Sequence, residues 1–102
     1  MQDAIRIGNE AIVSAQQSQS RVWEIRAWIS FLNLPVSDAL RPRAAEGLAR
    51  MQSLIEQSGA VGFEPWLIRA RAHWAADASL AAELRAMAVQ SFARIGVQHN
   101  LA

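Results

Sequence analysis

The chain has 102 residues, of which 52% are hydrophobic and 19% charged, and its formal net charge at pH 7 is +1. This size allows one domain, the apolar content excludes a disordered protein, and the near-balance of ten basic and nine acidic residues argues against a nucleic-acid surface. Without cysteine the chain can form neither disulfides nor thiolate sites. No apolar run is long enough to cross a membrane, so we expect a cytoplasmic protein.

Five helical segments are predicted, and no segment shows the period-two alternation of a strand. The first segment, residues 3–17, carries apolar residues at three- and four-residue spacing, with Asp3 as its predicted N-cap. The second, residues 21–32, ends before Pro35, because a proline disfavours helical geometry in the residue that precedes it.

The other three helices are predicted from stripes of apolar residues that are flanked by proline and glycine. They cover residues 43–57, residues 64–77 and a segment that Ser79 caps and that ends at residue 95. Pro42 and Pro65 fall in first turns, where the missing N–H of proline matters least. Gly59 and Gly96 occupy the position after the last helical turn, where glycine is favoured. Gly47 lies inside the third helix, where a glycine often permits another helix to approach closely.

The predicted helices repeat as pairs. The segment 23–27 (Trp-Glu-Ile-Arg-Ala) aligns with 66–70 (Trp-Leu-Ile-Arg-Ala), and Gly59 aligns with Gly96. This register divides the chain into the second helix of an earlier pair (1–20), two pairs (21–60 and 61–96) and the start of a further helix (97–102). Because repeat arrays normally end in capping helices, which neither end shows, we expect a fragment of a longer protein.

The second helix of each pair resembles a degenerate tetratricopeptide repeat. Ala88 and Phe92 stand at that family's small and aromatic positions, and Ala70 stands at the small position of its first helix. The likeness covers residues 21–102, but the pairs exceed the usual ~34 residues and no proline follows Ile95. The array is similar to those of bacterial ATPase-coupled LuxR-type and MalT-like transcriptional regulators and of class III adenylate cyclases.

This resemblance implies an all-α fold in which about five antiparallel helices stack as an α–α superhelix. The alternative is a closed bundle of four or five helices. The resemblance to tetratricopeptide repeats also implies a protein that binds a partner or senses an effector, while any catalytic or DNA-binding domain lies elsewhere in the parent protein.

The four tryptophans are candidates both for the core and for a ligand groove. Large aromatic side chains dominate burial, so Trp23 and Trp66 are expected in the core between helix pairs. Trp28 and Trp74 are instead candidates for the edge of a groove.

One histidine, His73, is a candidate for acid–base catalysis or metal binding. His73 shares a helix face with Asp77, one turn on, as an acid–base pair or half of a metal site would require. A metal ion needs more ligands, and His99 is the only other imidazole, so an ordinary hydrogen-bonded histidine is favoured.

Three arginines, Arg26, Arg69 and Arg71, could bind an anionic partner. Arg26 and Arg69 occupy equivalent positions of the repeat, which favours a structural role for both.

No catalytic, cofactor-binding or metal-binding residue is therefore predicted, and no cofactor is expected. We expect a non-enzymatic regulatory module that contacts a protein, a peptide or the rest of its parent chain. Its candidate contact residues are Trp28, Arg71, His73 and Trp74. The alternative is a small-molecule sensor, and an enzyme that uses His73 ranks third. A closed cavity near Trp28 or Trp74 would favour the sensor, and a shallow groove would favour the peptide.

Overall fold

The structure is a computed structural model that describes the backbone of residues 2–101 and the side chains of residues 3–95. This part of the chain is all-helical, as predicted. Its elements are α1 (Gln2–Gln17), α2 (Arg21–Leu32), α3 (Arg41–Ser58), the short 3-10 helix η1 (Val61–Phe63), α4 (Glu64–Trp74) and α5 (Ala78–Leu101).

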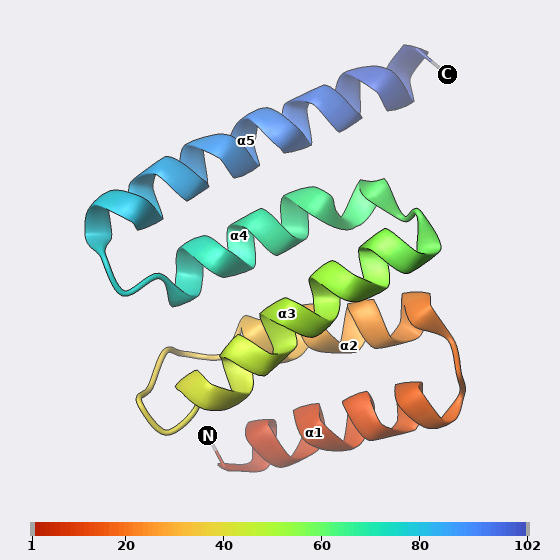
Figure 1. Cartoon of the computed structure of the whole chain (residues 1–102), viewed down its shortest axis with the longest axis vertical. Coiled ribbons are helices and arrows are strands. Elements are labelled where there is room, and N and C mark those ends of the chain that lie inside the picture. The colour runs from red at the N-terminus through yellow and green to blue at the C-terminus, as the bar shows by residue number, and fades with distance from the viewer. Residues whose placement is uncertain (1, 102) are drawn as a thin grey trace.

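The five α-helices stack in chain order, and successive helices run antiparallel (Figure 1). Every helix contacts the next one, and α2 also contacts α4. Because α1 and α5 lie at opposite ends (Figure 1), the molecule is an open stack rather than a bundle that its first and last helices close. It measures 41 × 36 × 20 Å, so that much of each helix lies near the surface.

Local sequence accounts for most helix ends. The Ser20 side chain caps α2 by accepting a hydrogen bond from the N–H of Trp23 at 3.3 Å. Gly59 ends α3 in the left-handed conformation, with φ of 70°, which glycine adopts without a steric penalty. Pro42 and Pro65 lie in the first turns of α3 and α4, as predicted.

Several predicted boundaries are wrong. Helix α5 continues through Gly96 to Leu101, because a glycine inside a helix costs only ~1 kcal/mol relative to alanine. The separate helix expected at 97–102 is thus the end of α5 as far as residue 101, and residue 102 lies outside the described part. Asp3 belongs to the first turn of α1 instead of preceding it.

The boundary between α4 and α5 also differs from the prediction. Helix α4 ends at Trp74 rather than at Asp77. The Asp77 carboxylate accepts a hydrogen bond from the N–H of Ser79 at 2.8 Å, so the acid, not the serine, caps the start of α5.

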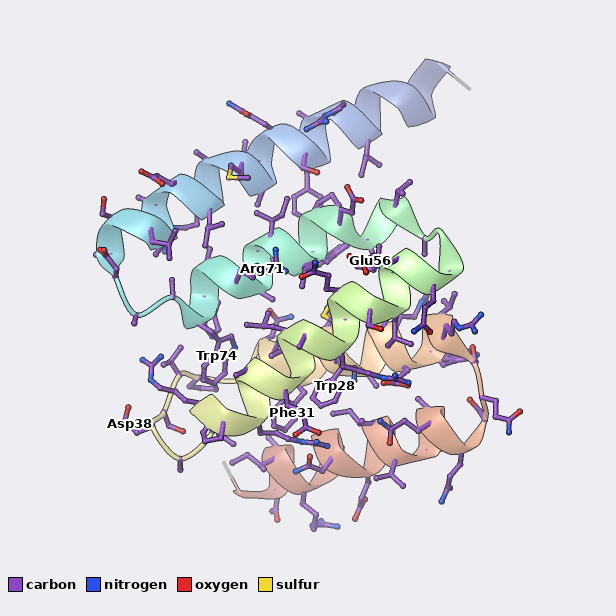
Figure 2. All side chains as sticks on the ribbon, in the orientation of Figure 1. Trp28, Phe31, Asp38, Glu56, Arg71 and Trp74 are labelled. Carbon is purple, nitrogen blue, oxygen red and sulfur yellow. The ribbon has the colours of Figure 1, made fainter. Side chains whose placement is uncertain are left out.

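The core lies where α1, α2, α3 and α4 meet. Its fully buried members include Ile12 of α1, Trp28 and Phe31 of α2, and Met51 of α3. The Trp28 ring meets Phe31 edge-on, with ring centroids 5.9 Å apart (Figure 2). A Cβ atom at Gly47 would lie 2.6 Å from this indole, so glycine is what allows α3 to approach Trp28, as its place in the helix had suggested.

The tryptophans are distributed between the core and the surface differently from the prediction. Trp23, expected in the core, is 62% exposed, whereas Trp28 and Trp74, expected at a groove edge, are 1% and 7% exposed. Trp66 is half-buried because α5 covers it, with its ring 5.1 Å from that of Phe92. The aligned residues Trp23 and Trp66 therefore have different surroundings.

Candidate functional site

Two of the four predicted contact residues belong to the interior. Trp28 is enclosed by α1 and α3, and the indole N–H of Trp74 donates a hydrogen bond to the carbonyl of Leu32 at 2.8 Å. Figure 2 shows Trp74 at the end of α4, turned toward the loop that follows α2. Both side chains stabilise packing between helices and leave no edge for a ligand.

The other two residues lie apart from each other at the surface. Arg71 donates a hydrogen bond to Gln52 of α3 and borders a shallow depression between α3, α4 and α5. His73 places Nε2 2.9 Å from the carbonyl oxygen of Leu34. Asp77, its proposed partner, instead caps α5, so the structure gives no support for a His–Asp pair.

The described residues contain no group of three or more histidines and carboxylates that could hold a metal ion. Within the same part of the chain, no helix is long and apolar enough to cross a membrane.

An open groove of about 430 Å³ lies between α1 and α2 and contains none of the predicted contact residues. Its α1 side consists of small residues: Ala11, Ser14, Ala15 and, just after the helix, Ser18. Its α2 side consists of Trp23, Arg26, Ala27 and Ser30. No acidic residue belongs to this lining in the described part of the chain.

Trp23 and Arg26 form the distinctive part of this groove. The Arg26 guanidinium lies 5.9 Å from the centre of the Trp23 ring, within the range of a cation–π contact. One turn of α1 before Ala11, Ile7 is 58% exposed and extends the apolar surface along that helix. The groove therefore presents an exposed aromatic ring, a positive charge and a wall of small side chains.

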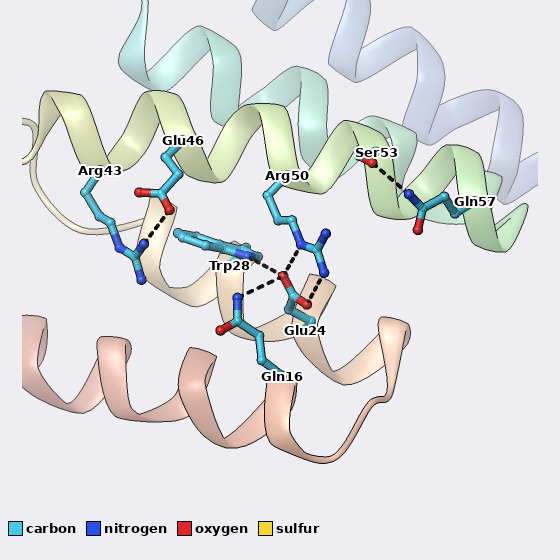
Figure 3. A network of polar contacts seen from close by, with 8 residues as sticks. All are labelled: Gln16, Glu24, Trp28, Arg43, Glu46, Arg50, Ser53 and Gln57. Carbon is cyan, nitrogen blue, oxygen red and sulfur yellow. Dashed lines mark hydrogen bonds and ion pairs between the residues drawn. The ribbon is translucent and has the colours of Figure 1, made fainter.

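A polar network centred on the buried Glu24 joins α1, α2 and α3 (Figure 3). The Glu24 carboxylate of α2 accepts two hydrogen bonds from the Arg50 guanidinium of α3, from Nε at 2.7 Å and from Nη2 at 2.9 Å. The same carboxylate accepts from the indole N–H of Trp28 at 3.0 Å and from Gln16 of α1 at 3.4 Å. The pKa of Glu24 is lowered, chiefly by the Arg50 hydrogen bond, although burial opposes this effect.

This network fixes the orientation of α2. Because Glu24, Ile25 and Trp28 face α3 and the core, Trp23, Arg26 and Ala27 must face the groove. The sequence alone missed the groove because α2 is apolar around most of its circumference, so its pattern does not define one buried face. The available signal was Glu24, an acid within that apolar run, which needed a cationic partner from another helix.

A scan against protein-family models, a search of curated proteins and a search of solved structures found no significant match to this chain.

Proposed function

We propose that this chain is a non-enzymatic interaction module whose α1–α2 groove binds an amphipathic helix of a partner protein. The observation that carries the proposal is Trp23, which is 62% exposed beside a groove of small residues. Tryptophan and arginine are the residue types most enriched at the energetic centres of protein interfaces. An isolated monomer gains nothing from leaving so large an apolar ring in water.

The shape and charge of the groove favour a helix as the occupant. The alanine and serine side chains of the α1 wall allow a helical backbone to approach closely, and the two antiparallel helices form a trough parallel to such a helix. Arg26 supplies a positive charge, and the lining contains no acid in the described part of the chain. The partner helix should therefore place apolar residues against Trp23 and Ala27 and a carboxylate near Arg26.

The small-molecule alternative receives less support at this site. The groove is open along its length, and the two tryptophans expected to edge a cavity, Trp28 and Trp74, are instead packed in the interior. The setting of the module, a bacterial signalling or transcription regulator, rests only on the resemblance of residues 21–102 to tetratricopeptide repeats.

Panning a display library of helical peptides against the whole chain tests this proposal. We expect the selected peptides to carry apolar residues at i, i+3, i+4 and i+7 together with an Asp or Glu. Trp23→Ala should weaken their binding about tenfold, as measured by fluorescence anisotropy, because it removes the main apolar contact. The same substitution should change the free energy of unfolding by no more than about 0.5 kcal/mol, because Trp23 lies on the surface.

Val89→Ala is the matched control, since Val89 is 68% exposed and belongs to α5, the helix at the opposite end of the stack from α1 (Figure 1). It should leave binding unchanged. Selected peptides that bind the Trp23→Ala variant as tightly as the wild type would overturn the proposal. A homodimer that Trp23→Ala dissolves, seen by sedimentation, would also overturn it, because the occupant would then be a second copy of this chain.

A further inference from the structure

A second pocket, of about 350 Å³, lies where the end of α2 approaches α4 and α5 and is built mainly from basic and amide side chains. Arg69 and His73 of α4, Arg85 of α5 and Asn33 at the end of α2 surround it, and the small side chain of Ala72 forms part of its wall. No carboxylate lines it in the described part of the chain, although the chain as a whole is nearly neutral. The positive charge is therefore concentrated locally.

The two guanidinium groups are held by different helices. Arg69 lies 5.5 Å from the centre of the Trp66 ring, a cation–π contact that restricts the side chain without neutralising it. The ion pairs between described residues involve Arg6, Arg41, Arg43 and Arg50, not Arg69 or Arg85. Two planar, permanently charged guanidinium groups whose residues line one pocket suit the oxygens of a phosphate group.

His73 borders the same pocket and is held by the segment that follows α2. A carbonyl oxygen only accepts, so the ring nitrogen Nε2 must donate to Leu34 and carries a proton. Leu32 and Leu34 present carbonyl groups at this end of α2, but Trp74 and His73 already occupy them, which reduces their repulsion of an anion.

We infer that this pocket binds the phosphate group of a small phosphorylated molecule, through Arg69 and Arg85. The volume is at the lower end of the range of small-molecule sites, about 300–1,000 Å³, and exceeds what a bare phosphate ion fills. The inference does not rest on the partner helix proposed above, since the two sites share no residue.

Isothermal titration calorimetry of the whole chain at constant ionic strength tests the inference, with inorganic phosphate and glucose 6-phosphate as probes. Both should bind, and the ester should bind more tightly because its sugar occupies the rest of the pocket. Arg69→Gln and Arg85→Gln should each weaken binding about tenfold, since each removes one charge-assisted contact. Arg94→Gln is the matched control, because Arg94 is an exposed arginine of α5 outside this pocket.

Three results would overturn the inference. One is the absence of phosphate-ester binding at millimolar concentration. Another is equal weakening by Arg94→Gln, which would show a general ionic effect instead of a site. The third is inorganic phosphate binding as tightly as glucose 6-phosphate, which would show that the pocket takes the free anion and not a phosphorylated molecule.

Discussion

Replacing Arg50 by methionine is expected to lower the free energy of unfolding at pH 7 by about 3 kcal/mol. The Glu24 side chain, 4% exposed, would lose the guanidinium that neutralises it. Breaking a buried ion pair in this way costs about 3–5 kcal/mol, and the lower end applies because the Arg50 side chain is 44% exposed and partly hydrated. Urea denaturation of the two proteins at equal concentration measures the difference.

The pH dependence of this difference provides a second check. In the wild type the pKa of Glu24 lies below its ordinary value of 4.5. The carboxylate therefore contributes stability above about pH 4.5, and that contribution is lost as the pH falls from there through the lowered pKa of the folded state. Without Arg50 the main lowering cause is absent while burial still raises the pKa. The destabilisation caused by Arg50→Met should thus shrink as the pH is lowered from 7 toward ~3.5, and a constant difference would contradict this account.

The matched control for this prediction is Arg6→Met. Arg6 pairs with Glu10 at 3.2 Å, but both side chains are more than half exposed. Exposed pairs contribute at most about 1 kcal/mol, because water already solvates both charges. A loss as large as that of Arg50→Met would show that burial of Glu24 is not the cause.

Gly47→Ala is expected to destabilise the protein by about 1–2 kcal/mol, although alanine is the better helix former. The added Cβ would lie 2.6 and 2.7 Å from two carbons of the Trp28 ring. This ring cannot move aside easily, because it is buried and its N–H is bonded to Glu24. Overpacking costs about 1–3 kcal/mol, whereas alanine gains ~1 kcal/mol in helix propensity. Because the ring is fixed, we expect the overpacking cost to exceed this gain. Thermal and urea unfolding measure the net effect.

Two comparisons isolate the cause. Gly62→Ala adds the same methyl group where nothing lies within 4 Å, so it should change stability by less than about 0.5 kcal/mol. In a Trp28→Leu background the collision is removed, and Gly47→Ala should then be neutral or stabilising, which makes the double-mutant cycle strongly non-additive. Additive effects would mean that Gly47 is not there to accommodate Trp28.

The positions of the helices follow from short-range chemistry. Proline in a first turn, a serine cap at Ser20 and the left-handed Gly59 each act within a few residues, so the sequence predicts the bounds of α2 and α3 to within two residues. Gly96 was misjudged because the same residue type either ends a helix or is tolerated inside it at small cost. Whether the helix ends or continues at such a glycine depends on the helix propensity of the residues that follow it.

Tertiary structure, and not the sequence pattern, decides which face of each helix is buried. Trp23 and Trp28 lie on the same helix and have the same chemistry, yet one is exposed and the other is enclosed. The choice depends on Arg50, which is 26 residues from Glu24 in sequence and forces the acid, and with it the Trp28 side of α2, against α3. Likewise Arg69, Arg85 and His73 line one pocket only because α4 and α5 pack side by side. Periodicity within one helix carries no information about which partner will cover it, so sequence patterns predict the helices but only packing decides the groove and the basic pocket.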